Sequence, residues 1–222
     1  MGIQIIGNGG TIIGAGEEAR KPMHVTNMPK GGNSYRLATF TGTIGAALAA
    51  NSEVFQFRFL SGTKTWALIE KVVFDGLGIV AVATAAGPLG FQMVPARAWT
   101  AAGSGGTRIA VSGDNLQMET ALANSQANDI GIATTGALTA GTKTLDANAI
   151  GQAIGGVGTA AVTAYGPSSI IAPQMLFNSE GTTIPLVLAN QEGFIIKTTH
   201  AGPAGLTYVA GFTVQWVEVT AF

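Results

Sequence analysis

The chain has 222 residues, a net charge of −1 and no cysteine, and only 10% of its residues are charged. The lack of cysteine excludes disulfides, thiolate metal sites and cysteine nucleophiles, and the near-zero net charge gives no electrostatic basis for binding nucleic acid or an anionic membrane. Because a surface so poor in charge keeps a free monomer poorly soluble, we expect a subunit that covers much of its surface in an assembly. The alternative is a Gly- and Ala-rich monomer whose outside carries uncharged polar residues.

Residues 1–34 predict an extended N-terminal arm. Five glycines between residues 7 and 16 disfavour a helix, and Pro22 and Pro29 favour extended backbone before them. Such a segment has little to pack on itself, so we expect it to lie on another subunit or along its own sheet. The start of the chain has neither a basic region nor a long apolar core, so no export signal is predicted.

The clearest strand pattern runs through residues 52–74. Its first half alternates aromatic and polar side chains, which places them on opposite faces of a strand. The aromatic face carries Phe55, Phe57 and Phe59, and the other face carries Gln56 and Arg58. A turn-like S-G-T-K-T sequence follows before the alternation resumes. We therefore predict a β-hairpin whose aromatic face lies in the core, with the two polar residues facing outward or into a subunit contact.

Further segments with a period of two predict additional strands separated by turn residues. The predicted strands are residues 35–42, 79–84, 91–99 with a break at Pro95, 108–112, 130–134, 184–189, 194–199 and 206–219. Residues 190–193 predict a hairpin loop between the two strands that flank them. Residues 44–50 fit a helical turn or a loop, 116–122 fit a strand better than a helix, and 136–164 indicate short strands and long loops.

These elements indicate an all-β protein with little helix. We predict a β-sandwich or jelly-roll-like domain over residues 35–222, preceded by the extended arm. Residues 76–96 are uncharged and long enough to span a bilayer, but glycines and prolines interrupt them. Two short strands around a Gly-Pro turn explain this segment better, so no membrane span is predicted.

No sequence motif predicts catalysis, a cofactor or a metal. The chain has only two histidines, His24 and His200, no G-x-S-x-G motif and only scattered carboxylates. Residues 14–19 match G-x-G-x-x-A but lack the strand before and the helix after that a dinucleotide site needs. We therefore expect a protein without enzymatic activity, cofactor or metal.

The tryptophans differ in their surroundings. Trp66 and Trp216 lie on apolar strand faces and are expected in the core, whereas Trp99 precedes a loop. Trp99 is therefore the best candidate for an exposed aromatic residue, such as a platform for a sugar ring.

Three segments resemble parts of the virion structural proteins of tailed bacteriophages. They read LAANSEVFQFR at residues 48–58, GTKTLD at 141–146 and LVLANQEGF at 186–194. The resemblance implies a capsid decoration, or cement, protein: a small β-rich subunit, often trimeric, that clamps major capsid subunits together. The implied partners are the major capsid protein and copies of the chain itself, and the implied location is the capsid surface of a virion, after synthesis in the host cytoplasm.

For that role we expect the basic residues of the arm region and two residues of the domain to contact the shell or another subunit. The candidates are Arg20, Lys21, Lys30, Arg36, Arg58 and Trp99. The alternative function is a tail or head fibre or appendage module that binds a host receptor or glycan through Trp99 and the loop after it.

Overall fold

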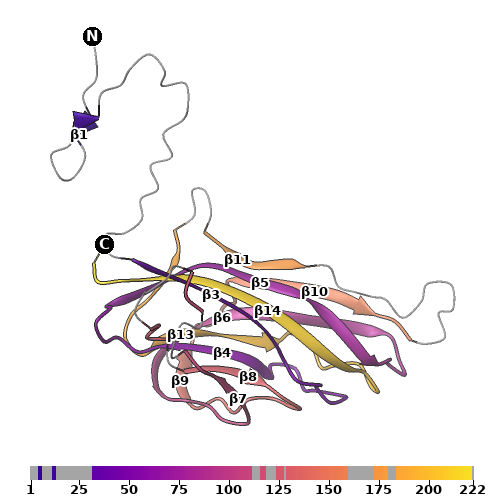
Figure 1. Ribbon diagram of the computed structural model, residues 1–222. Helices are drawn as coiled ribbons and strands as arrows, with labels where there is room; N and C mark the ends of the chain where they lie inside the picture. The colour runs from indigo at the N-terminus through magenta and orange to yellow at the C-terminus, as the bar shows by residue number, and fades with distance from the viewer. Residues whose placement is uncertain are drawn as a thin grey trace, which may run out of the picture.

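The computed structural model describes residues 5–6, 12–13, 32–111, 116–118, 124–127, 129–159, 173–179 and 184–221. Within these residues the protein is all-β, and two antiparallel sheets pack face to face, as predicted (Figure 1). The predicted arm falls largely outside the described residues, which include only its short strands β1 (Ile5–Ile6) and β2 (Ile12–Ile13), paired with each other, and its last three residues.

Five strands form one sheet and seven form the other. The five-stranded sheet has the order β11–β5–β14–β3, with β12 also pairing β5: β3 Asn33–Phe40, β5 Trp66–Ala81, β11 Gln174–Asn178, β12 Leu186–Leu188 and β14 Thr207–Val219. The seven-stranded sheet has the order β10–β6–β13–β4–β8–β7, with β9 also pairing β6: β4 Glu53–Phe59, β6 Gly87–Ala101, β7 Gly106–Ile109, β8 Asp129–Ala133, β9 Thr142–Leu145, β10 Gly151–Val157 and β13 Glu192–Thr198.

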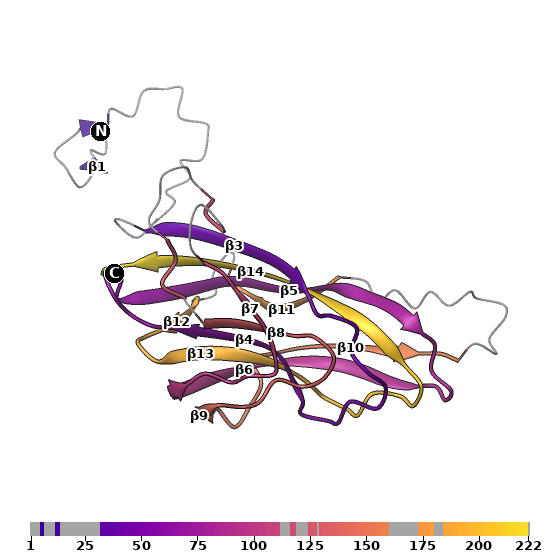
Figure 2. The same cartoon turned by 60° about the horizontal axis from the view of Figure 1, so that its bottom comes forward.

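The strand pairs are nested along the chain. The first strand of the body, β3, pairs with the last, β14; β4 pairs with β13; β5 pairs with β12 and β11; and β6 pairs with β10. This nesting is a long antiparallel ribbon rolled so that its pairs alternate between two sheets, which is the topology of a jelly roll. Figure 2 shows β3, β14 and β5 in one layer and β4, β13 and β6 in the other. Strands β7, β8 and β9 form an insertion between β6 and β10.

The predicted hairpin pairings are wrong, although the strands exist. The two halves of the predicted 52–74 hairpin, β4 and β5, lie in different sheets, and so do the strands on either side of residues 190–193, β12 and β13. Turn residues specify where a chain reverses but not whether the next strand pairs with the last one or crosses the core. Here the aromatic faces of the two strands are buried against the opposite sheet instead of side by side.

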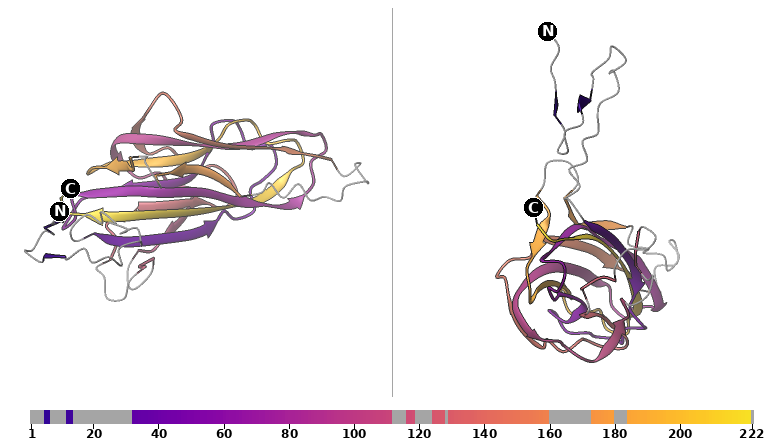
Figure 3. Two further views of the ribbon diagram at one scale, coloured as in Figure 1. Left: turned by 90° about the horizontal axis from the view of Figure 1, so that it is seen from above. Right: turned by 60° about the vertical axis from the view of Figure 1, so that its left-hand side comes forward.

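The core lies between the sheets and is rich in aromatic rings. The three phenylalanines of β4 are completely buried, as predicted. Phe57 meets Trp216 of β14 edge-on with ring centroids 5.1 Å apart, and Phe74 of β5 packs against Phe91 of β6 at 5.0 Å. Viewed end-on, the two sheets curve around this core (Figure 3). Burying each such ring contributes about 1.5–3 kcal/mol, so the core rings stabilise the roll.

The predicted break at Pro95 is absent, because β6 continues through it. Pro95 O accepts a hydrogen bond from Asp146 N at 3.0 Å, on the edge of β6 where pairing passes from β10 to β9. The nitrogen and oxygen of one residue in a strand point to the same edge, so the missing N–H of Pro95 falls in the gap between those two partners.

Residues 76–96 also differ from the prediction. They include the end of β5 and the start of β6, two long strands in different sheets, instead of two short strands around a Gly-Pro turn. Residues 44–50 form a loop, which is one of the two predicted alternatives, and Ile44 makes an isolated bridge to Tyr208. The described part of 116–122 likewise makes only a bridge, between Gln117 and Tyr35.

Candidate functional site

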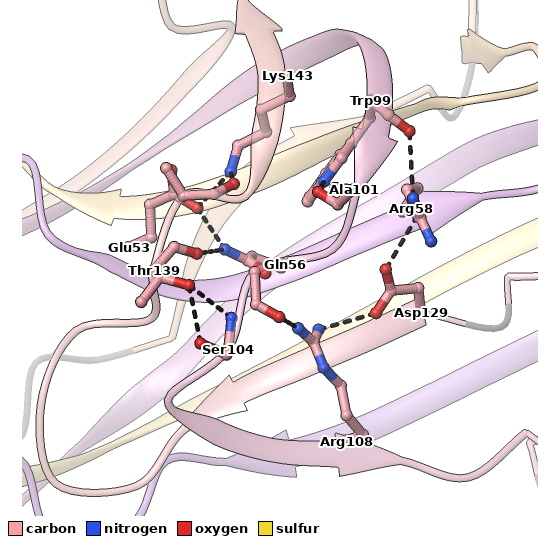
Figure 4. A network of polar contacts seen from close by, with 12 residues as sticks. Glu53, Gln56, Arg58, Trp99, Ala101, Ser104, Arg108, Asp129, Thr139 and Lys143 are labelled. Atoms are coloured by element: carbon pink, nitrogen blue, oxygen red, sulfur yellow. Dashed lines mark hydrogen bonds and ion pairs between the residues drawn. The ribbon is translucent and has the colours of Figure 1, made fainter.

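A layer of polar side chains lies on the outer face of the seven-stranded sheet, on the side of β4 away from the aromatic core. The prediction that Gln56 and Arg58 face outward or into a subunit contact is wrong, because Gln56 is completely buried and the Arg58 side chain is only 12% exposed within the chain itself. The inserted strands and the loops beside them cover both residues (Figure 4). We call this group the polar layer; it consists of Glu53, Gln56, Arg58, Arg108, Asp129, Thr139 and Lys143.

One half of the polar layer is built around the carboxylate of Glu53. Lys143 Nζ lies 2.8 Å from Glu53 Oε2, and Gln56 Nε2 donates to the same oxygen at 2.6 Å. Gln56 Nε2 also donates to Thr139 O at 2.8 Å, and Lys143 Nζ donates to Ala140 O. These hydrogen bonds attach the segment 139–143 to β4. The Lys143 amine and the Gln56 amide therefore hold the inserted segment against the sheet.

The other half is built around the carboxylate of Asp129 on β8. Its Oδ2 lies 2.9 Å from Arg58 Nε, and its Oδ1 lies 2.9 Å from Arg108 Nη1. Arg108 also donates to Gly103 O, while Arg58 Nη1 donates to Trp99 O at 3.2 Å. One carboxylate thus holds two guanidinium groups from neighbouring strands in place.

Trp99 is not an exposed platform, which corrects the prediction. Its side chain is completely buried, and Nε1 donates to Ala101 O at 3.0 Å. Its ring faces the Lys143 ammonium, with Nζ 4.5 Å from the ring centroid. A loop after a tryptophan suggested exposure, but the inserted strand β9 folds back on it. Two of the predicted interface residues, Arg58 and Trp99, therefore do meet, but inside the domain.

The buried position of Lys143 changes its acidity. Loss of water contact lowers the pKa of the Lys143 amine from its usual value. The hydrogen bond and negative charge of Glu53 oppose this effect, and the charge of Arg108 adds to it. The amine therefore loses its proton more readily than an exposed lysine does, and it faces a carboxylate that can accept the proton.

The remaining predicted residues do not converge on a site. Arg36 is exposed on β3, while Arg20, Lys21 and Lys30 lie outside the described residues. His200 is paired with the neighbouring Thr199, whose Oγ1 lies 2.8 Å from His200 Nδ1. His24 and the G-x-G-x-x-A segment fall outside the described part of the chain. Within that part, no group of three His, Cys, Asp or Glu side chains could hold a metal ion.

A third buried carboxylate, which was not predicted from the sequence, lies at the end of β14. Glu218 is completely buried, and its Oε1 accepts hydrogen bonds from Ser125 Oγ at 2.6 Å and Trp216 Nε1 at 3.0 Å. Gln126 N donates to both carboxylate oxygens. This carboxylate anchors segment 124–127 to the sheet, which is a structural task. In the sequence, the only signal for this buried carboxylate is the W-x-E spacing, which places Trp216 and Glu218 on the same side of a strand.

The outer face of the five-stranded sheet carries exposed apolar side chains at one end, beside charged residues such as Arg36 and Asp75. Phe40 is 72% exposed and Val80 is 61% exposed. Phe40 pairs with Gly211, and Val209 pairs with Gly78, so glycines lie beside the large side chains. We call Phe40, Gly78, Val80, Val209 and Gly211 the outer apolar patch. Exposed apolar side chains of this kind often mark contacts between proteins.

Comparison with known proteins found no matching protein family, no matching curated protein and no matching solved structure. The residues that the structure describes contain no helix that could cross a membrane. The jelly roll, the polar layer and the outer apolar patch are therefore the features from which a function can be inferred.

Proposed function

We propose that this chain is a non-enzymatic structural protein of a phage virion, and specifically a capsid decoration protein that binds and stabilises the shell of major capsid subunits. The observation that carries the proposal is the outer apolar patch, where Phe40 and Val80 stand exposed on a rigid sheet. Large exposed apolar groups lower the solubility of a free subunit, and they are typical of surfaces that a partner covers.

The distribution of charge supports the same role. In the polar layer, each charged side chain is paired with an oppositely charged group or a backbone carbonyl of the same chain. Such closed pairing suits a rigid body better than it suits a site that exchanges substrates. The jelly roll supplies that rigid body, and interfaces of permanent assemblies are more apolar than transient ones.

In this proposal, the arm of residues 1–34 extends the contact onto a neighbouring subunit. Its basic residues Arg20, Lys21 and Lys30, with Arg36 on β3, would meet acidic or polar groups of the shell. Copies of the chain would associate as homotrimers around that contact. In this proposal the outer apolar patch supplies apolar contact area, and the arm supplies basic side chains that extend the contact to a neighbouring subunit.

The proposal is tested by the copy number of this protein in purified virions, measured by quantitative mass spectrometry against the major capsid protein. A decoration protein is expected in a fixed, high ratio to the major capsid protein. Absence from virions would overturn the virion role. A few copies per particle would instead indicate the alternative, a tail or fibre module, although its expected platform, Trp99, is buried.

A second experiment addresses the arm. Deletion of residues 1–31, which leaves β3 whole, is expected to leave a folded domain with an unchanged circular dichroism spectrum that no longer co-sediments with shells lacking the protein. The full chain is the positive control. If the shortened chain still binds the shells, the arm has no part in docking and the outer apolar patch acts alone.

A further inference from the structure

One oxygen atom of Glu53 joins a buried amine to a buried amide. Glu53 Oε2 accepts from Lys143 Nζ at 2.8 Å and from Gln56 Nε2 at 2.6 Å. The second acceptor of Gln56 Nε2, Thr139 O at 2.8 Å, fixes which end of the amide is nitrogen. A nucleophilic nitrogen and a potential leaving nitrogen therefore share one proton-accepting atom (Figure 4).

The surroundings exclude water from these three groups. The side chains of Lys143 and Glu53 are 2% and 8% exposed, and Gln56 is completely buried. The buried ring of Trp99 covers the amine from one side. Burial lowers the pKa of the Lys143 amine and so favours its neutral form, which is the nucleophile.

The amide of Gln56 is held in an unusual state. Its Oε1 atom is buried and has no hydrogen-bond partner in the described part of the chain. A Cβ atom at Gly103 would lie 2.7 Å from both Nε2 and Oε1, so the loop backbone is packed directly on the amide. A purely structural amide is normally satisfied at both ends, so the unpaired carbonyl calls for another explanation.

We propose that Lys143 and Gln56 join in an intramolecular isopeptide bond, with Glu53 moving the protons. Glu53 Oε2 takes a proton from Lys143 Nζ, and the free amine attacks Gln56 Cδ. Glu53 returns the proton to Nε2, the Cδ–Nε2 bond breaks, and the new Nζ–Cδ amide remains. The nitrogen leaves as ammonia, which carries the surplus proton away as ammonium. No oxidant, reductant or metal is needed.

This reaction occurs once in each chain, so it is compatible with a structural role and does not depend on the virion proposal. The bond would tie β4 covalently to β9 and lock the insertion over the seven-stranded sheet. A cross-link between positions so distant in sequence restricts the unfolded chain strongly. The expected gain is resistance to unfolding.

The test is the intact mass of the purified full-length protein after prolonged incubation in its folded state. The mass is expected to fall below the sequence mass by one ammonia molecule, and tryptic digestion is expected to yield a branched peptide that joins Gln56 to Lys143. An intact mass equal to the sequence mass overturns the proposal. This measurement requires no variant, so it does not depend on whether a variant folds.

Variants then assign the roles. Lys143→Arg keeps a cation near Trp99 but removes the primary amine, and Glu53→Gln removes the proton carrier; both are expected to show the full sequence mass. Lys197→Arg on β13 is the matched control and is expected to keep the loss of ammonia. Loss of ammonia in Lys143→Arg would contradict the assignment of the amine, and loss in Glu53→Gln would contradict the role of the carboxylate.

Discussion

The outer faces of the two sheets differ in whether other parts of the chain cover them. The seven-stranded sheet carries charged side chains on its outer face, yet the insertion of β7, β8 and β9 covers them. The five-stranded sheet carries Phe40 and Val80 on its outer face, and they remain exposed. A chain with only 10% charged residues thus places several of them inside and leaves apolar residues outside. The covered face thus forms part of the domain interior, whereas the open face leaves large apolar side chains in contact with water.

The largest loss of stability is expected from a substitution in the polar layer on the covered face. Asp129→Asn removes the carboxylate that pairs with both Arg58 and Arg108 and leaves two cations without a counter-charge. We expect a loss of about 2–4 kcal/mol in the free energy of unfolding, below the full value for a buried pair because Arg108 is partly exposed. Chemical denaturation measures it.

A matched control for this change lies on the surface. Arg97 is paired with Asp146 and Glu192, but its side chain is 38% exposed. Arg97→Gln is expected to cost less than about 1 kcal/mol because water screens exposed pairs. Equal losses for the two variants would show that the covered face contributes no more stability than an ordinary surface.

A smaller effect tests how closely the loop packs on the polar layer. A Cβ atom added at Gly103 would collide with Thr139 O and with the Gln56 amide, so Gly103→Ala is expected to cost about 1–3 kcal/mol. Gly136→Ala is the control, because nothing lies within 4 Å of its added Cβ atom. Thermal unfolding of both variants compares them. A destabilisation as large in the control would contradict the packing argument.

A still smaller effect concerns Tyr208, which lies under the open sheet. Its hydroxyl is buried without a hydrogen-bond partner in the described residues, and burial raises the pKa of the phenol above its usual 10.0. Tyr208→Phe is therefore expected to change stability by about 0–1 kcal/mol, in the stabilising direction, at neutral pH.

The same raised pKa predicts a pH dependence. In the folded state Tyr208 keeps its proton above pH 10, whereas the unfolded chain loses it, so the folded state binds more protons there. This group leaves the free energy of unfolding unchanged with pH below pH 10, and that free energy falls as the pH rises further because only the unfolded chain releases the proton. Relative to Tyr208→Phe, the natural protein should lose stability above pH 10. The same change of the free energy of unfolding with pH in both proteins above pH 10 would contradict this prediction.

The smallest effect on stability is expected on the open face. Phe40→Ser replaces a side chain that is 72% exposed, so the free energy of unfolding should change by no more than about 0.5 kcal/mol. Binding to capsid shells, measured by co-sedimentation, should nevertheless fall sharply. A variant that binds shells as well as the natural protein would remove the outer apolar patch from the proposed interface.

Much of the strand inventory could be predicted from the sequence. The alternation of Phe55, Phe57 and Phe59 predicted a strand with one buried face, and all three are buried. The opposite face could not be predicted, because Gln56 alternates in the same way whether water or another layer of the chain covers it. Trp99 was misplaced for the same reason: the covering strand β9 lies more than 40 residues further along the chain.

Local alternation and turn residues were enough to predict an all-β protein, the positions of most strands and the burial of the three phenylalanines of β4. The pairing of the strands depends on contacts between distant parts of the chain, because adjacent strands such as β4 and β5 cross to opposite sheets instead of forming a hairpin. The tertiary structure also brought Glu53, Gln56 and Lys143 into contact. The contact among these three residues forms because the inserted segment that contains β9 folds back onto the sheet, and no local sequence pattern specifies that path of the chain.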